Sequence, residues 1–465
     1  MFTFYNSINC NPIDLTLVPG SIGQDVVQAS LAKVNQIKLF ADDLGFLFRL
    51  ALVETNFGQN PRTFATNNNN TKNNESPNIW SIDEQKFRET QEIQKYPELL
   101  GIYYELADKY DIDWQRLDLD DMQRPLYSAL ASKMFLHLSG QPIPETIDDQ
   151  AHYWKQHYTT SVQADVQQFV RDVHKLEDLF ECTPHINLCY VLDGSGSIAP
   201  NDFQMAKDFL YKVTDKISSE NGQFCLVLFS TGVQTIYDFS LTNKPKRLDL
   251  IRNIRQPNGV TNTRGGIQQT VDIMRASSPI AQIPYKTMFV LTDGKSNHIT
   301  PGVQPAVSNA QLADINSWVW GVGRGVYVRE LLEIAYNLPE NVKQLTKYSS
   351  MDSYLYQFKT TVCSEPLQLI IGQKFKDTTV KQEKRYYIIG LPKTAGGINL
   401  TVQTTKGKLQ GYYAYSTPHP SSAVNDGQFA DHIYITGQQQ QHSLVYVAIV
   451  GQQIANAYSI IATNA

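Results

Sequence analysis

The sequence predicts three domains: a helical domain over residues 1–180, a doubly wound α/β domain over 182–363, and an all-β sandwich over 364–465. The spacing of the apolar residues predicts this division. In the first domain, apolar residues recur at helical intervals. In the second, continuous apolar runs alternate with helical stretches, and in the third, short β-rich runs are separated by Gly, Pro, Ser and Gln. The length of 465 residues also suits two to four domains, because one hydrophobic core rarely grows so large.

Three segments of the first domain carry apolar residues at intervals of three and four, which predicts helices. They are FADDLGFLFRLALVE, MQRPLYSALASKMFLHL and ADVQQFVRDVHKLEDLF. The polar run ATNNNNTKNNESPN lies between the first two. We expect this run to be an exposed loop.

Buried strands are predicted in the second domain by the runs INLCYVLD, GQFCLVLFS, YKTMFVLTD and SWVWGVG. Because helical stretches separate these runs, we expect a parallel sheet covered by helices on both faces. In the third domain, INLTVQTT, LQGYYAYST, HIYITG and HSLVYVAIVG have the pattern of an antiparallel sandwich. We expect this sandwich to be a spacer or a partner-binding module.

The composition excludes several function classes. Charged residues make up 18% of the chain, and the formal net charge is −5. This balance provides neither a basic surface for nucleic acid nor a polybasic patch for a membrane. No apolar stretch is long enough to cross a bilayer. The first residues lack the features of a signal peptide, so we expect an intracellular chain or one whose leader precedes this numbering.

Oxygen-bearing side chains follow the first strand of the second domain, in the order Asp193-Gly-Ser195-Gly-Ser197. Ligands of an open parallel sheet bind at the carboxyl ends of its strands. Thr261, in a Gly-flanked loop, and Asp293, at the end of another strand, provide further oxygens. Hydroxyl and carboxylate oxygens are the ligands that Mg²⁺, Mn²⁺ and Ca²⁺ prefer. The sequence therefore predicts a site for Mg²⁺, with Mn²⁺ or Ca²⁺ as alternatives.

This set of motifs resembles the von Willebrand factor type A domain with its metal-ion-dependent adhesion site, over roughly residues 185–360. The resemblance implies that the two serine hydroxyls bind the ion directly and that Thr261 binds it directly or through water. It implies that Asp193 and Asp293 act through water and hydrogen bonds. An open coordination position would then accept an Asp or Glu carboxylate from a protein partner. We therefore expect a secreted adhesion or matrix protein.

The cysteines bear on the compartment of the protein. None of the five has a partner at CxxC spacing, which makes a zinc site improbable. Cys189 and Cys225 lie in apolar runs and are expected to be buried thiols. The resemblance implies a disulfide between Cys182 and Cys363, which would contribute about 4–5 kcal/mol and indicate an oxidising compartment. Cys10 would then be free or would link two chains.

Glu54 ends an apolar helical run, where apolar surroundings would raise the pKa of a carboxyl, as a general acid for glycoside cleavage requires. Together with NIWSIDEQKF, RPLYSALASKMFLHL and HYWKQHYTT, this run resembles a lysozyme-like or lytic-transglycosylase-like domain. Three positions depart from the family pattern. Thr55 stands where the family has Ser, Ser81 where it has Gln, and Tyr158-Thr159 where it has Tyr-Asn. The alternative is a solvated or helix-capping role for Glu54.

Three hypotheses of function remain open. The first is adhesion through a Mg²⁺-bridged carboxylate of a protein partner. The second is a muramidase-like or chitinase-like hydrolase with Glu54 as general acid, which would bind a glycan. The third is a structural protein that assembles into fibres or a matrix, with the metal site bridging neighbouring copies.

Overall fold

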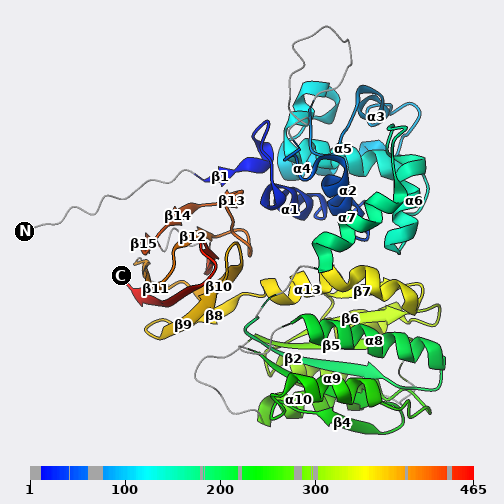
Figure 1. The fold of residues 1–465 in the computed structure, drawn as a ribbon, viewed down its shortest axis with the longest axis vertical. Helices are drawn as coiled ribbons and strands as arrows, with labels where there is room; N and C mark the ends of the chain where they lie inside the picture. Colours follow the sequence, from blue (N-terminus) through cyan, green and yellow to red (C-terminus); the bar gives the residue numbers. More distant parts are fainter. Residues whose placement is uncertain are drawn as a thin grey trace, which may run out of the picture. The chain divides into compact units, whose positions relative to one another are not determined.

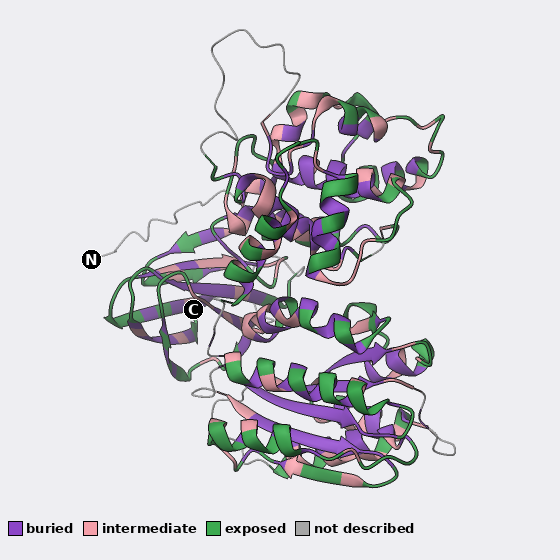
Figure 2. Ribbon diagram, turned by 45° about the vertical axis from the view of Figure 1, so that its right-hand side comes forward, coloured by how far each residue is buried: buried purple, intermediate pink, exposed green. Residues whose placement is uncertain are grey.

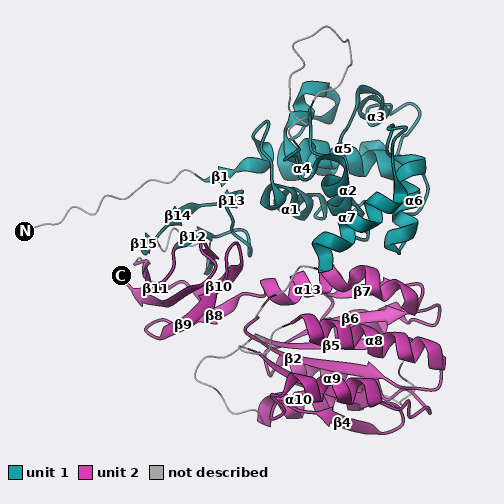
Figure 3. Ribbon diagram, in the orientation of Figure 1, with its two compact units in different colours: residues 1–179, 409–449 teal, residues 180–408, 450–465 magenta. Residues whose placement is uncertain are grey.

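The chain divides into two compact units in the computed structural model (Figure 3). Unit 1 comprises residues 1–179 and 409–449, and unit 2 comprises residues 180–408 and 450–465. Cys10 and most of the Asn-rich run lie outside the described residues. The structure describes residues 12–40, 42–60, 77–178, 182, 184–217, 222–276, 285–294, 296, 302–392, 396–436 and 442–465.

Helices are the main secondary structure of the described residues up to Asp178, as the apolar spacing predicts (Figure 1). They are α1 (Gln24–Val34), α2 (Phe46–Thr55), α3 (Glu84–Glu89), α4 (Leu99–Tyr110), α5 (Pro125–Leu138), α6 (Ile147–His157) and α7 (Val166–Asp178), with the 3₁₀ turns η1 (Leu15–Leu17), η2 (Trp114–Arg116) and η3 (Leu119–Gln123). Their apolar faces share one hydrophobic core, in which Trp80 and Trp114 are buried. The short strand β1 (Ile13–Asp14) pairs antiparallel with β13 (Val424–Asn425), so residues distant in sequence complete this unit.

A buried ion pair connects two helices of unit 1. Arg49 of α2 donates from Nε to Glu177 of α7 over 2.9 Å, and its Nη1 donates to Gln150 of α6 over 2.8 Å. Both charged side chains are more than nine-tenths buried. Such a pair holds the helices in one arrangement, because each charge depends on the other for its stabilisation.

A six-stranded sheet forms the centre of the α/β part of unit 2, in the order β4-β3-β2-β5-β6-β7. Its strands are β2 (Ile186–Asp193), β3 (Gln223–Phe229), β4 (Val233–Tyr237), β5 (Tyr285–Thr292), β6 (Ile315–Val322) and β7 (Val342–Leu345). The prediction of a parallel sheet is wrong at one edge, where β4 runs antiparallel to β3. Only residues 230–232 connect these two strands, which is too short for a parallel crossover.

Helices cover both faces of this sheet, as predicted (Figure 1). The α/β part contains α8 (Pro200–Lys216), α9 (Lys244–Asn253), α10 (Thr263–Ala276), α11 (Gln304–Gln311), α12 (Val328–Ile334) and α13 (Leu355–Ser364), with the 3₁₀ turns η4 (Pro339–Asn341) and η5 (Tyr348–Tyr354). α10, α11 and α12 share a core with one face of the sheet. All eight residues of the central strand β2 are buried, and the helices expose their outer sides (Figure 2).

Strands after residue 366 form further β sheets, which confirms the β-rich prediction for this region. They are β8 (Leu367–Leu369), β9 (Lys374–Thr379), β10 (Lys384–Gly390), β11 (Ile398–Lys406), β12 (Leu409–Ala414), β14 (Gly427–Phe429), β15 (His432–Ile435), β16 (Leu444–Gly451) and β17 (Asn456–Asn464). β17 pairs antiparallel with β9 and β11, and β12 pairs antiparallel with β14. β8 and β10 are parallel, which departs from a purely antiparallel arrangement.

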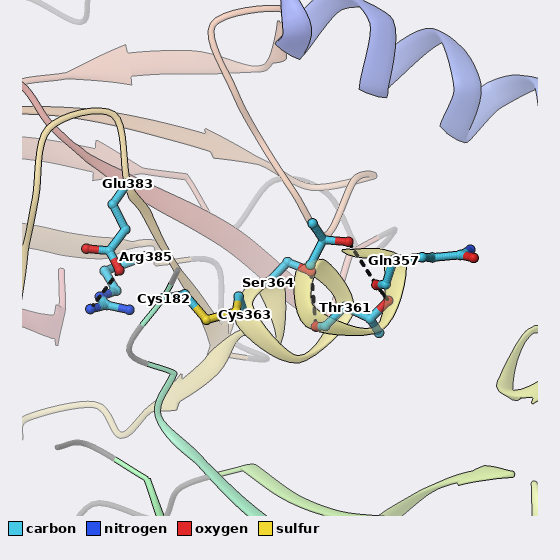
Figure 4. The surroundings of a disulfide bond; sticks show 8 residues. Cys182, Gln357, Thr361, Cys363, Ser364, Glu383 and Arg385 are labelled. Carbon is cyan, nitrogen blue, oxygen red and sulfur yellow. Dashed lines mark hydrogen bonds and ion pairs between the residues drawn. A yellow bond between two sulfur atoms is a disulfide. The ribbon is translucent and has the colours of Figure 1, made fainter. Parts of the chain in front are cut away.

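Two disulfides are present in unit 2. Cys182 and Cys363 form the bond that the family resemblance implies, with their Cα atoms 6.0 Å apart (Figure 4). Cys189 and Cys225 are buried as predicted, but they form a second disulfide rather than two thiols. These residues lie directly opposite each other in the register of β2 and β3, which brings their Cα atoms within 4.5 Å. Their pairing therefore follows from the strand register.

Candidate metal centre

Four of the five predicted residues, Asp193, Ser195, Ser197 and Asp293, meet at the carboxyl ends of β2 and β5. These strands are parallel neighbours, with Leu192 opposite Leu291, so their ends lie side by side. The hydroxyl oxygens of Ser195 and Ser197 are 3.1 Å apart. Ser197 Oγ also donates a hydrogen bond to Asp293 Oδ1 over 3.0 Å. The two hydroxyls and one carboxylate therefore form a compact oxygen cluster.

Asp193 fixes the shape of the serine loop. Its side chain is fully buried, and Oδ1 accepts a hydrogen bond from the backbone N–H of Ser195 over 2.8 Å. Its Oδ2 accepts the hydroxyl of Thr292, the last residue of β5, over 2.7 Å. These bonds join the ends of β2 and β5. Thr292 has no obvious signal in the sequence, because a threonine in a buried strand is ordinary.

The loop that carries Thr261 packs against the serine loop. Gly196 N–H donates to Gly259 O over 3.0 Å, and Asn258 N–H donates to Gly194 O over the same distance. Gly259 has a φ of 94°, and a Cβ at this position would lie 2.3 Å from Thr231 Oγ1. Glycine is therefore required here for both conformation and space.

The carbonyl groups of the serine loop have a second anchor in Gln256. Its amide donates to Ser195 O over 3.0 Å and to Ile198 O over 2.8 Å. Thr261 is buried, and its carbonyl accepts the hydroxyl of Ser296 over 3.3 Å. Sequence reasoning missed Gln256 and Ser296, because their partners lie far away in the chain.

The carboxyls of the cluster resist ionisation. Burial, together with the neighbouring Asp193 carboxylate, raises the pKa of Asp293 to about 6. Burial also raises the pKa of Asp193, although hydrogen bonds from Ser195 and Thr292 oppose this effect. A bound divalent cation would reverse both shifts, because it favours the ionised carboxylates.

The spacing of the oxygens fits an octahedral Mg²⁺ ion. Ligands at about 2.0–2.1 Å in adjacent octahedral positions lie about 2.9–3.0 Å from each other. The separation of 3.1 Å between the hydroxyls of Ser195 and Ser197 is close to this value. In the part of the chain that the structure describes, no group of three His, Cys, Asp or Glu side chains is placed to hold a metal ion.

Glu54 lies at the C-terminal end of α2 in unit 1. Trp154 of α6 donates its indole N–H to Glu54 Oε1 over 2.7 Å, and Ser81 provides a further hydrogen bond. Burial raises the pKa of Glu54 and outweighs these bonds. Tyr158 donates to Trp80 O and lies 2.9 Å from Ser132 Oγ. Glu54 and Ser81 are recognisable in the sequence, but no sequence pattern predicts the contact between Glu54 and Trp154.

Comparisons with known proteins agree with the architecture of unit 2. Residues 187–357 match the family profile described as von Willebrand factor type A domain. Integrin alpha-X of Mus musculus is 28% identical over 177 residues, which cover 37% of this chain and 14% of the integrin. Collagen alpha-4(VI) chain of Mus musculus is 27% identical over 228 residues, which cover 47% of this chain and 9% of the collagen chain.

A solved structure also matches part of the chain. Proximal thread matrix protein 1 from the mussel byssus is 22% identical, with a TM-score of 0.36, over 43% of this chain and 50% of the other. By its match to the family profile, the chain contains a von Willebrand factor type A domain, and it spans a small fraction of the curated relatives that it matches. Among the described residues, none of the helices combines the length and apolarity that a membrane span requires.

Proposed function

We propose that the von Willebrand factor type A domain binds Mg²⁺ and uses it to capture a carboxylate of a protein partner, in an extracellular adhesion or matrix role. The hydroxyls of Ser195, Ser197 and Thr261 would hold the ion, and Asp193 and Asp293 would support them. The observation that carries this proposal is the oxygen cluster at the ends of β2 and β5, with separations of 3.0 and 3.1 Å.

The charges around the cluster explain why the ion would recruit an acid. Neutral hydroxyls leave most of the charge of a divalent cation uncompensated. Asp193 is already engaged by Ser195 N–H and Thr292, so its carboxylate orients the loop. Ser197 lies at the surface, which leaves the outer side of the cluster open to a partner. An Asp or Glu side chain from outside would complete both the coordination and the charge balance.

The extracellular role is supported by two further observations. The matched relatives include an integrin and a collagen chain, whose names point to adhesion and matrix proteins. Unit 2 also contains two disulfides, and structural disulfides persist mainly in oxidising compartments. The sequence motifs, the oxygen geometry and the disulfides thus favour the same class of protein.

A calorimetric titration with Mg²⁺ and Mn²⁺ tests the metal site directly. The double variant Ser195→Ala/Asp293→Ala should lose at least 100-fold in metal affinity, because it removes one direct and one supporting oxygen. The matched control is Asp238→Ala/Ser240→Ala, which removes an Asp–Ser hydrogen bond from an exposed turn of the same domain. Equal metal affinity in the wild type and the site variant would refute the assignment.

Partner capture requires a separate measurement. Immobilised chain is exposed to extracellular matrix extract in Mg²⁺ or in EDTA, and retained proteins are identified. We expect capture in Mg²⁺ alone, and none by the site variant. Retention that is indifferent to EDTA would contradict metal bridging even if the ion itself binds.

A glycoside hydrolase activity of unit 1 is a second proposal, favoured by the raised pKa of Glu54 and its hydrogen bond from Trp154. A carboxyl whose pKa is raised by burial keeps its proton to a higher pH and can donate it to a leaving glycosidic oxygen. Turbidity of peptidoglycan and chitin suspensions should fall with wild-type protein and stay constant with Glu54→Gln. The exposed Glu98→Gln serves as the control. Constant turbidity with wild-type protein would rule out this activity on both polymers.

A further inference from the structure

A buried arginine lies on the face of the α/β sheet that α8 and α9 cover. Arg247 of α9 is 1% exposed, and its guanidinium lies 4.9 Å from the centre of the Phe224 ring. Its Nη1 donates to Leu241 O over 3.3 Å. Its Nε–H has no acceptor among the described residues. Burial of a guanidinium is costly unless an anion compensates its charge.

Two tyrosines of the same sheet lie beside this guanidinium. Tyr190 of β2, Leu226 of β3 and Tyr237 of β4 occupy one row of the sheet register, so their side chains share a face. α9 packs against α8 and β4, which places Arg247 over this row. Tyr237 is 4% exposed, and its hydroxyl makes no hydrogen bond of ordinary geometry within the described ranges, although the Thr214 hydroxyl lies close enough to lower its pKa.

The hydroxyl groups of Tyr190 and Tyr237 are neutral and do not compensate the positive charge of Arg247. Burial raises the pKa of Tyr190 to about 12 and holds the pKa of Tyr237 well above its ordinary value, so both phenols stay protonated at neutral pH. Tyr190 OH accepts the hydroxyl of Thr214 over 3.3 Å and keeps its own hydrogen for another acceptor. Burial lowers the pKa of Arg247, and the groups that oppose this shift are the two tyrosines, not a carboxylate.

We propose that this interior binds one monovalent anion of the halide class, such as chloride, between Arg247, Tyr237 and Tyr190. A halide ion neutralises the guanidinium and accepts hydrogen bonds from any direction, so it satisfies Arg247 Nε–H and Tyr237 OH together. A water molecule would accept from these donors but would leave the positive charge uncompensated. The site lies away from the metal-binding loops, because Tyr190 lies three residues before Asp193 on the buried strand β2.

Thermal unfolding of the full chain tests the anion directly. Melting curves are recorded in EDTA, with sodium chloride or bromide replacing sodium gluconate at constant ionic strength. Each tenfold rise of halide above half-saturation should raise the melting temperature of unit 2 by roughly 3–6 °C. Crystals soaked in bromide should give an anomalous peak between Arg247 and Tyr237. Equal melting temperatures in chloride and gluconate, or no anomalous peak, would overturn the proposal.

Variants separate the site from general salt effects. Arg247→Met should abolish the halide dependence, and Tyr237→Phe should weaken halide affinity about tenfold through the loss of one donor. Arg252→Met is the control, because Arg252 also lies in α9 and over a ring, that of Tyr211, but at the surface. It should keep the wild-type halide response. A halide response that survives in Arg247→Met would contradict the assignment. If Arg247→Met does not fold, a wild-type halide response in Tyr237→Phe would contradict it instead.

Discussion

Removal of the Cys182–Cys363 disulfide should destabilise unit 2 strongly. The bond joins the last turn of α13 to the segment that enters β2, so it closes nearly the whole α/β part into a loop (Figure 4). The double variant Cys182→Ala/Cys363→Ala removes the bond and leaves no free thiol from it. Cys189 and Cys225 keep their own disulfide in this variant.

The expected magnitude follows from the size of the loop. The two cysteines are 181 positions apart in the chain. In the chain-entropy model, a loop of this length lowers the entropy of the unfolded chain by about 18 cal/mol/K, which is about 5 kcal/mol at 25 °C. We therefore expect the free energy of unfolding of unit 2 to fall by about 5 kcal/mol, because the unfolded chain gains that entropy.

Urea denaturation with pulsed hydrogen exchange of the β2 peptide measures this change. All residues of β2 are buried, so its amides exchange when unit 2 unfolds. Thr361→Ala is the matched control: it removes only a hydrogen bond from the Thr361 hydroxyl to Gln357 O on the exposed side of α13, and should change stability by less than about 0.5 kcal/mol. A loss below about 1 kcal/mol in the double cysteine variant would refute the entropic reasoning.

Three further predictions concern stability and the site. Burial raises the pKa of Glu365 to about 8, so the folded state keeps a proton that the unfolded state releases above pH of about 4.5. The free energy of unfolding should fall as the pH rises from about 4.5 to 8. In urea titrations, Glu365→Gln should remove this pH dependence and should have a free energy of unfolding up to about 5 kcal/mol higher than the wild type at pH 8.5. Arg49→Met should lower the free energy of unfolding by about 3–5 kcal/mol, measured by circular dichroism, because it removes the cation that is paired with the buried Glu177 carboxylate. Gly259→Ala should lower both the melting temperature and the Mg²⁺ affinity seen by calorimetry, because its Cβ would collide with Thr231; unchanged affinity would show that this loop does not shape the site.

Local patterns in the sequence were sufficient to locate the candidate metal centre. A buried strand followed by Asp193, Ser195 and Ser197 places their oxygens at one strand end, and parallel neighbours share that edge with Asp293. The helices of unit 1 were also predictable, because the spacing of apolar residues repeats within each segment. The family resemblance indicated the Cys182–Cys363 bond before the structure placed the two sulfurs together.

Only the tertiary structure decided which distant groups meet. Gln256 holds the serine loop through two carbonyls, and Cys189 lies opposite Cys225 because of strand register. Arg247 interacts electrostatically with Tyr237 because α9 packs against the edge strand β4. These contacts join residues from separate elements, and their partners depend on packing and register. A sequence pattern specifies the periodicity of one element, but it does not specify which neighbouring element lies against it.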